Sequence, residues 1–195
     1  MKILVVGDKE SSYIWDHFDR ERFRDVRLII STGDLSADYL SFLVTMLNVP
    51  LLYVPGNHDE SYLANPPEGC ENIDGRIYRF GDITILGLGG SRRYKSGPFQ
   101  YTERQMNWRV KKLAYALWRA KHVDILVSHA PADGVCDGKD LCHRGFPAFN
   151  AIIERFHPRY FIHGHQHMSY GSGPRVSDYR GTLVINSEGY YIFEY

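Results

Sequence analysis

Long apolar runs, cysteines and an excess of charge of one sign are all scarce in this sequence. The 195-residue chain holds three cysteines, and its 23 Lys and Arg residues balance 23 Asp and Glu residues. Since no run reaches about 18 consecutive apolar residues, we expect no transmembrane helix. The apolar run 3–6 is too short for the core of a secretory signal peptide. Few cysteines without a dense framework fit a reducing compartment, so we expect a cytoplasmic protein.

The balanced charge also argues against whole classes of partner. General nucleic-acid binders and polybasic membrane binders usually carry a basic excess, so we expect no membrane partner and consider nucleic acid an unfavoured one. Average proportions of hydrophobic and charged residues, 44% and 24%, exclude a disordered or collagen-like chain. The length favours a single domain over residues 1–195. The oligomeric state is left open.

Short apolar runs that predict strands alternate with amphipathic stretches that predict helices. The expected strands are 2–6, 27–31, 50–54, 76–80, 83–88, 124–128 and 159–163, with further strands in 175–195. The expected helices are 11–18, 36–47, 102–120 and 147–156. Ser36 and Thr102 stand at helix-starting positions, and Thr102 with Gln105 forms a capping-box pattern. Crossovers together with hairpins indicate mixed sheets with helices outside them.

Five of the apolar runs end in carboxylate, carboxamide or imidazole groups, and five of the nine histidines of the chain lie there. Ligands of open α/β sheets gather beyond the carboxyl ends of strands. The pooled donors are Asp8, Glu10, Asp34, Asn57, His129, His165 and His167. Hard oxygen and borderline nitrogen donors suit Mn, Fe, Zn or Mg ions. Seven donors exceed one tetrahedral ion and favour two ions that share a carboxylate.

These strand-end residues resemble the motifs of the calcineurin-like metallophosphoesterase superfamily in order and in spacing. The matching segments are Asp8-Lys9-Glu10, Gly33-Asp34, Gly56-Asn57-His58-Asp59, Ser128-His129 and Gly164-His165-Gln166-His167. The resemblance implies a four-layer α/β/β/α sandwich of two mixed β-sheets flanked by helices. It also implies hydrolysis of a small phosphorylated substrate, a phosphate ester, by in-line attack of a metal-bound hydroxide.

The resemblance further implies a role for each matching residue. Asp8 and His167 would hold the first divalent ion, and Asp34 would bridge both ions. The second ion would be held by Asn57, His129 and His165. His58 would face the phosphate and stabilise or protonate the leaving oxygen, as a catalytic residue.

Glu10 stands where the family pattern has histidine. As a ligand it would favour Mn or Mg over Zn, and we expect Mn²⁺, with Fe, Zn or Mg as further options. Three carboxylates leave two divalent ions with a charge of about +1, against about +2 with a neutral histidine. The less positive centre favours a phosphodiester weakly over a phosphomonoester. If Glu10 misses the ion, the first site weakens, and a metal-binding interaction module without turnover becomes the alternative. A nuclease of the same superfamily is less favoured, because the chain is short and neutral.

Several residues near these motifs are further candidates for catalysis or substrate binding. Asp59 is expected to act in catalysis by orienting His58, or else to cap the helix that follows. His143, Arg144 and Arg92 are expected to bind substrate, since arginine contacts phosphate through two nitrogens. The loops that would shape the substrate site are 64–75, 89–101 and 132–146.

For other residues, the sequence predicts no catalytic role. His163 is either a group that orients a ligand or a satisfied polar residue at a strand end. The stripe Trp108, Tyr115 and Trp118 has helical spacing and is expected to serve packing rather than to form a base-stacking platform. Cys136, Cys142 and His143 lack the spacing of a zinc knuckle, so no zinc site is predicted there.

Overall fold

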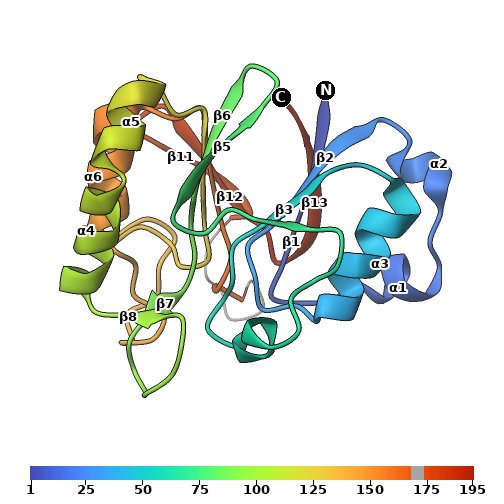
Figure 1. Ribbon diagram of the computed structural model, residues 1–195, viewed down its shortest axis with the longest axis horizontal. Coiled ribbons are helices and arrows are strands. Elements are labelled where there is room, and N and C mark those ends of the chain that lie inside the picture. Colours follow the sequence, from blue (N-terminus) through green and yellow to red (C-terminus); the bar gives the residue numbers. More distant parts are fainter. Residues whose placement is uncertain (168–173) are drawn as a thin grey trace.

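A computed structural model describes residues 1–167 and 174–195, and it consists of two facing sheets with helices on their outer sides (Figure 1). The first sheet has the strand order β13-β1-β2-β3-β4. Its strands are β1 Lys2–Gly7, β2 Val26–Ser31, β3 Leu51–Tyr53, β4 Glu71–Asn72 and β13 Gly189–Glu194. The C-terminal strand β13 pairs antiparallel with β1, whereas β1, β2, β3 and β4 run parallel.

The second sheet has the strand order β11-β12-β10-β9-β6-β5. Its strands are β5 Arg76–Phe80, β6 Ile83–Leu88, β9 Ile125–Ser128, β10 Tyr160–His163, β11 Val176–Tyr179 and β12 Thr182–Asn186. The four central strands are parallel, and the edge strands β5 and β11 are antiparallel. A separate short pair joins β7 Ser91–Arg92 to β8 Gln100–Tyr101. Both large sheets are mixed, as the sequence predicts.

Helices cover the outer side of each sheet (Figure 1). The first sheet carries α1 Ser12–Asp16, α2 Arg20–Phe23 and α3 Ala37–Leu47, and a 3-10 turn, η1 Glu60–Leu63, follows β3. The second sheet carries α4 Glu103–Lys112, α5 Ala114–Ala120 and α6 Pro147–Phe156. This arrangement confirms the four-layer sandwich. Two expected helices are shorter than predicted, because 11–18 yields only α1 and 102–120 divides at Leu113.

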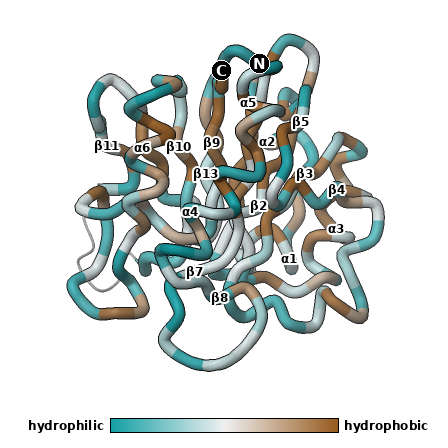
Figure 2. Tube along the Cα trace, turned by 60° about the vertical axis from the view of Figure 1, so that its left-hand side comes forward, coloured by the Kyte–Doolittle hydropathy of each residue, from teal (hydrophilic) through white to brown (hydrophobic). Residues whose placement is uncertain are grey.

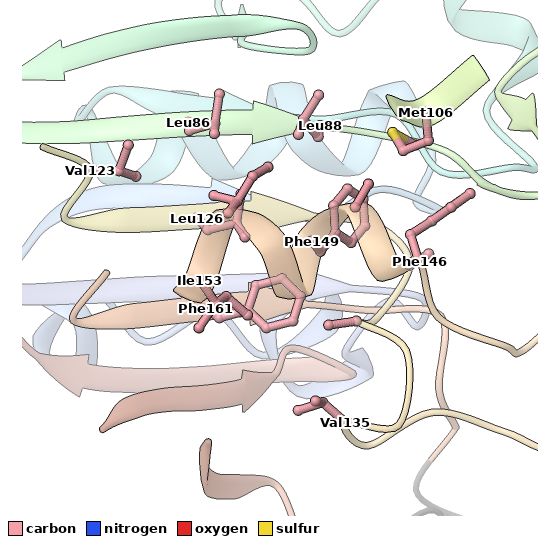
Figure 3. Close-up of a cluster of buried hydrophobic side chains, with 14 of the residues drawn as sticks. Leu86, Leu88, Met106, Val123, Leu126, Val135, Phe146, Phe149, Ile153 and Phe161 are labelled. Carbon is pink, nitrogen blue, oxygen red and sulfur yellow. The ribbon is translucent and has the colours of Figure 1, made fainter. Parts of the chain in front are cut away.

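Apolar side chains fill three interfaces of the sandwich, and hydrophilic segments lie around its periphery (Figure 2). Ile30 of β2 and Ile125 of β9 belong to the cluster between the sheets. Behind the second sheet, Leu126 and Phe161 of the strands lie beside Phe149 of α6 (Figure 3). Burial on both faces explains why these strands read as continuous apolar runs rather than alternating ones. In the described part of the chain, no helix is long and apolar enough to cross a membrane.

Candidate metal centre

Three of the predicted ligands have left-handed backbone conformations at the ends of their strands. The φ angles are 59° for Asp8 after β1, 56° for Asp34 after β2 and 67° for His165 after β10. Such angles are uncommon for residues other than glycine, and they concentrate at functional sites. Asp8 Oδ1 accepts a hydrogen bond from the main-chain N of His165 over 2.8 Å, which joins the two sheets at this point.

Two glycines allow these side chains to approach each other. A Cβ atom on Gly56 would collide with the carboxylate of Asp34 and with the ring of His129. A Cβ atom on Gly164 would lie 2.5 Å from Asp8 Oδ2. The glycines before these motifs therefore serve close approach, which a larger residue would prevent.

His129 lies at the centre of the cluster and is fully buried. Its Nδ1 lies 2.9 Å from the carbonyl oxygen of Thr32, and because a carbonyl only accepts, Nδ1 carries the proton. In the neutral ring Nε2 therefore offers a lone pair. His165 is oriented in the same way, since its Nε2 donates to the carbonyl of Cys142 over 2.7 Å and leaves Nδ1 as the acceptor. Such hydrogen bonds select which nitrogen can bind a metal.

Four acceptor atoms consequently meet at one point. Around His129 Nε2, Asn57 Oδ1 lies at 2.9 Å, His165 Nδ1 at 3.1 Å and Asp34 Oδ2 at 3.4 Å. The donor atoms of Asp34, His129 and His165 all lie within 4.8 Å of one another. Facing lone pairs repel unless a proton or a cation lies between them. The arrangement fits a metal ion with mixed oxygen and nitrogen ligands.

The titration behaviour of the cluster reflects the same need for positive charge. Burial opposes a charge on His129, but Asp34 outweighs burial and raises the pKa of His129 to about 9. Burial lowers the pKa of His165 to about 3, and the nearby His129 adds to this effect. The pKa of Asp34 lies well below its usual value, because His129 and the main-chain N of His58 outweigh its burial. Without a metal, a proton on His129 supplies the charge.

A second set of donors lies beside Asp8. Its Oδ2 is buried and has no hydrogen-bond partner among the described residues. Burial raises the pKa of Asp8 to about 6, an effect that a bound cation would reverse. His167 Nδ1 lies 3.1 Å from Glu188 Oε1, which places a further carboxylate next to this histidine. The unpartnered oxygen of Asp8 fits a second metal position.

The donors open into a cavity of about 490 Å³. It is lined by Asp8, Asp34, Asn57, His58, Tyr94, Cys142, His143, His165 and His167. His58 is exposed, and its main-chain N donates to Asp34 Oδ1 over 2.8 Å. The cavity thus brings six of the seven predicted metal ligands and His58 together, counting His129 at its buried end.

Glu10 has a different environment from the other predicted ligands. Its Oε1 accepts hydrogen bonds from the main-chain N, at 3.1 Å, and the hydroxyl of Ser36, at the start of α3. The carboxylate lines a neighbouring cavity of about 440 Å³ together with Lys9, Tyr13 and Arg175. Glu10 is not among the residues that line the metal cavity. We therefore expect its carboxylate to stabilise the start of α3, and variants of Glu10 test the predicted ligand role.

The helix-capping role predicted for Asp59 requires a correction. Asp59 is only 2% exposed, and Oδ2 accepts hydrogen bonds from the main-chain N of Asp34 at 2.8 Å and of Gly56 at 2.7 Å. It makes no side-chain cap on η1, so the capping role is wrong. Asp59 does not line the cavity either, and it acts as a positioning residue that ties the β2 and β3 loops together. Burial raises its pKa to about 6.

The predicted substrate-binding residues divide into two groups. His143 lines the cavity, and its ring centroid lies 5.2 Å from that of His165. Arg92 instead donates to Gly145 O and to Glu103, and Arg144 donates to Asp133. Neither arginine lines the cavity, so a role in substrate binding stays a prediction for both. Their charges stabilise the surrounding loops.

The loop beside His143 also holds a compact group of Asp140, Cys142 and His143. Asp140 Oδ1 accepts from the main-chain N atoms of Cys142 and His143, which is the hydrogen bonding of an Asx turn. This turn accounts for the compact geometry of the three side chains. The turn also positions the Cys142 carbonyl that orients His165.

Tyr94 and the loop carbonyl of Cys142 are parts of the site that sequence reasoning missed. The Asn57 amide nitrogen donates to Tyr94 Oη over 3.3 Å, which leaves Asn57 Oδ1 to face His129. No local signal marks Tyr94, because it is a single polar aromatic residue in the loop between β7 and β8. His163, for which two roles were open, is buried with Nδ1 against Gly164 O. Its Nε2 has no partner in residues 1–167 and 174–195, so a satisfied strand-end residue is not what the structure contains.

Comparisons with known proteins agree with this fold. A protein of Thermus thermophilus, TT1561, superposes with a TM-score of 0.64 at 17% identity, over 96% of this chain and 89% of its own. Another solved structure superposes with a TM-score of 0.69 at 16% identity, over 98% and 93% of the two chains. At these identities the likeness shows the fold alone. Among curated proteins, none matches the chain significantly. The family model for calcineurin-like phosphoesterases matches residues 1–169, and the chain therefore belongs to that family.

Proposed function

We propose that the protein hydrolyses a phosphate ester at a centre of two divalent metal ions, with Mn²⁺ as the expected metal. The observation that carries this proposal is the convergence of Asn57, Asp34 and His165 on Nε2 of His129. Only a cation or a proton relieves such a group of facing lone pairs. Family membership supports metal-dependent phosphoester hydrolysis in general.

We assign the ligands around His129 to one ion and those beside Asp8 to the other. Asn57, His129 and His165 would hold one ion, Asp8 and His167 the other, and Asp34 would be shared. When bound, the two ions supply a Lewis acid for the phosphoryl oxygens and an activated water. The protein contributes fixed ligand directions, because Thr32 O, Cys142 O and Tyr94 Oη each hold one ligand.

His58 is the residue that would donate a proton to the leaving oxygen. It lines the cavity and is exposed, and its main chain is bonded to the proposed shared ligand Asp34. An imidazole titrates near neutral pH, which suits proton donation to an alkoxide. The His58 side chain contributes no atom to the converging ligand group, so it remains available for substrate.

A phosphodiester is the favoured substrate, and a phosphomonoester is the second candidate. The preference rests on the number of carboxylates around the ions, since a less positive centre attracts a dianion less. Asp8 and Asp34 line the cavity and Glu188 lies against His167, so the centre has a carboxylate-rich surrounding even where Glu10 faces Ser36.

The experiment that tests the function measures bound metal and turnover in the same preparation. With Mn²⁺ added, we expect two ions per chain and hydrolysis of a generic phosphodiester above that of a monoester. Full metal sites without turnover of either ester would contradict the proposal and support an interaction module. Faster turnover of the monoester would overturn the substrate preference alone.

His58→Ala tests the leaving-group role separately. We expect the variant to retain both metals and to lose turnover by about 10²- to 10⁴-fold, the range of general acid catalysis. His17→Ala, which changes an exposed histidine at the end of α1, is the matched control and should retain wild-type turnover. Wild-type rates in the His58 variant would show that another group protonates the leaving oxygen.

A further inference from the structure

The aromatic stripe of α4 and α5 is on the surface, contrary to the packing role expected for it. Trp108 is 57% exposed, Tyr115 70% and Trp118 73%. The helical repeat places these residues on one side, while Met106, Leu113 and Leu117 fill the core from the other side. Figure 1 shows α4 and α5 at the outer edge of the molecule. Large aromatic residues gathered on one exposed face indicate a contact surface.

The same face is strongly basic, although the whole chain is neutral. Residues 103–121 contain six Lys and Arg against one acidic residue, Glu103. Of these charged residues, Arg109 forms an ion pair with Asp74, and Glu103 forms one with Arg92. Both charges are therefore compensated within the protein. Five exposed cations remain, and no carboxylate of the described residues pairs with them. They are Arg104, Lys111, Lys112, Arg119 and Lys121.

Aromatic and cationic side chains are interleaved along this face. The Lys112 ammonium lies 3.4 Å from the ring centroid of Trp108, and the rings of Tyr115 and Trp118 are 6.0 Å apart. Beside the face, an apolar slot of about 190 Å³ lies between α5 and α6 and has Lys111 and Arg155 in its lining. An adjoining cavity of about 600 Å³ includes Trp118, Arg119 and Lys121. Apolar recesses with cations in their walls suit an amphiphile that has a negative head.

We propose that the α4–α5 face docks the protein on a bilayer surface rich in anionic lipids. Trp and Tyr favour the headgroup level of a membrane, and each nearby Lys or Arg adds attraction to anionic lipid. A second copy of the chain through the same face would bring two basic surfaces together, which charge repulsion opposes. The phosphates of a nucleic acid would pair with the cations, but a nucleic acid would not fill the apolar slot. This proposal replaces the expectation of no membrane partner, which was based on the balanced total charge.

The test measures binding of the full chain to vesicles by co-sedimentation. We expect binding to vesicles of equal parts phosphatidylglycerol and phosphatidylcholine, weak binding to pure phosphatidylcholine, and loss of binding at high salt. The variant Lys111→Glu with Arg119→Glu should lower partitioning at least about tenfold. Tyr115→Ser with Trp118→Ser should also weaken it, while hydrolysis of a soluble ester stays at the wild-type rate.

The matched control reverses two exposed cations on other elements, Arg27→Glu with Arg79→Glu, and should leave partitioning unchanged. Equal effects of the control and the helix variant would overturn the proposal. So would absence of binding to the anionic vesicles, wild-type binding by the aromatic variant, or tighter binding to a single-stranded oligonucleotide than to vesicles. None of these outcomes depends on phosphoesterase activity, so the docking and the proposed function can fail independently.

Discussion

At the scale of single residues, the backbone conformation at the ligands sets the directions in which their side chains point. The backbone at Asp8 and Asp34 is left-handed, and hydrogen bonds to Gly33 O and Asp59 Oδ2 hold it there. A strained backbone of this kind costs about 1–3 kcal/mol per residue and persists only where its surroundings enforce it. The enforcing group at Asp34 is Asp59, a buried carboxylate with no place in the cavity. A residue that binds no metal can therefore position one that does.

Mutation of Glu10 separates a structural role from a role as a metal ligand. Because its carboxylate accepts two hydrogen bonds at the N-terminus of α3, Glu10→Ala should lower the free energy of unfolding by about 1 kcal/mol. The bound metal should stay at the wild-type level, which denaturant titration and metal analysis would check together. Glu10→Gln, which keeps an acceptor oxygen, should recover part of the stability. Loss of one metal in both variants would instead identify Glu10 as a ligand.

At the scale of elements, α3 and α4 start at the capping residues that the sequence predicts. Ser36 Oγ accepts from the N of Tyr39, and Thr102 forms a capping box with Gln105. The end of the predicted helix 102–120 is different, since the chain turns at Leu113 and resumes as α5. Leu113 is buried, so tertiary packing determines that break.

The capping box of α4 can be tested alone. Thr102→Ala removes the side-chain oxygen that accepts from the N of Gln105, so we expect a loss of about 1 kcal/mol in stability. Thr45→Ala, at an exposed position inside α3, is the control and should change stability by no more than about 0.5 kcal/mol. Urea unfolding measures both. Equal losses would show that the cap contributes nothing specific.

At the scale of the whole molecule, the candidate centre joins two sheets that meet mainly through apolar side chains. Asp8 and Asp34 follow strands of the first sheet, whereas His129 and His165 follow strands of the second. An ion held by both sets would cross-link the sandwich at this edge. Ligand binding that requires the folded state then stabilises the whole chain.

Removal of metal should therefore lower the melting temperature. With Mn²⁺ at about 100 times its Kd, binding adds about 2.7 kcal/mol. For a chain of this size, that corresponds to a rise of roughly 5–10 °C in Tm over the chelated protein. Calorimetry with and without chelator would measure it. His58→Ala should retain the rise and Asp34→Asn should lose most of it, and an identical rise in both would show that metal binds elsewhere.

Much of the fold follows from short-range patterns that the sequence states directly. Continuous apolar runs such as 28–30 predict strands buried on both faces, and β2 is buried at these three positions. The order of donors along the chain also predicts the family and most of the site. Arg92 and Arg144 could not be assigned in this way, because whether an arginine meets substrate or Asp133 depends on where distant loops lie. The same limit applies to Tyr94 and to the exposure of Trp118.

By itself, the sequence determined the alternation of strands and helices, the helix-starting residues and the donors that strand ends would present. These properties arise from periodicity and from contacts between near neighbours along the chain. Only the tertiary structure decided that Glu10 faces Ser36, that Asp59 supports two loops and that an aromatic, basic helix face stays uncovered. The physical reason is that each of these outcomes depends on contacts between residues far apart in sequence, or on the absence of a covering element. No local pattern of residues encodes either.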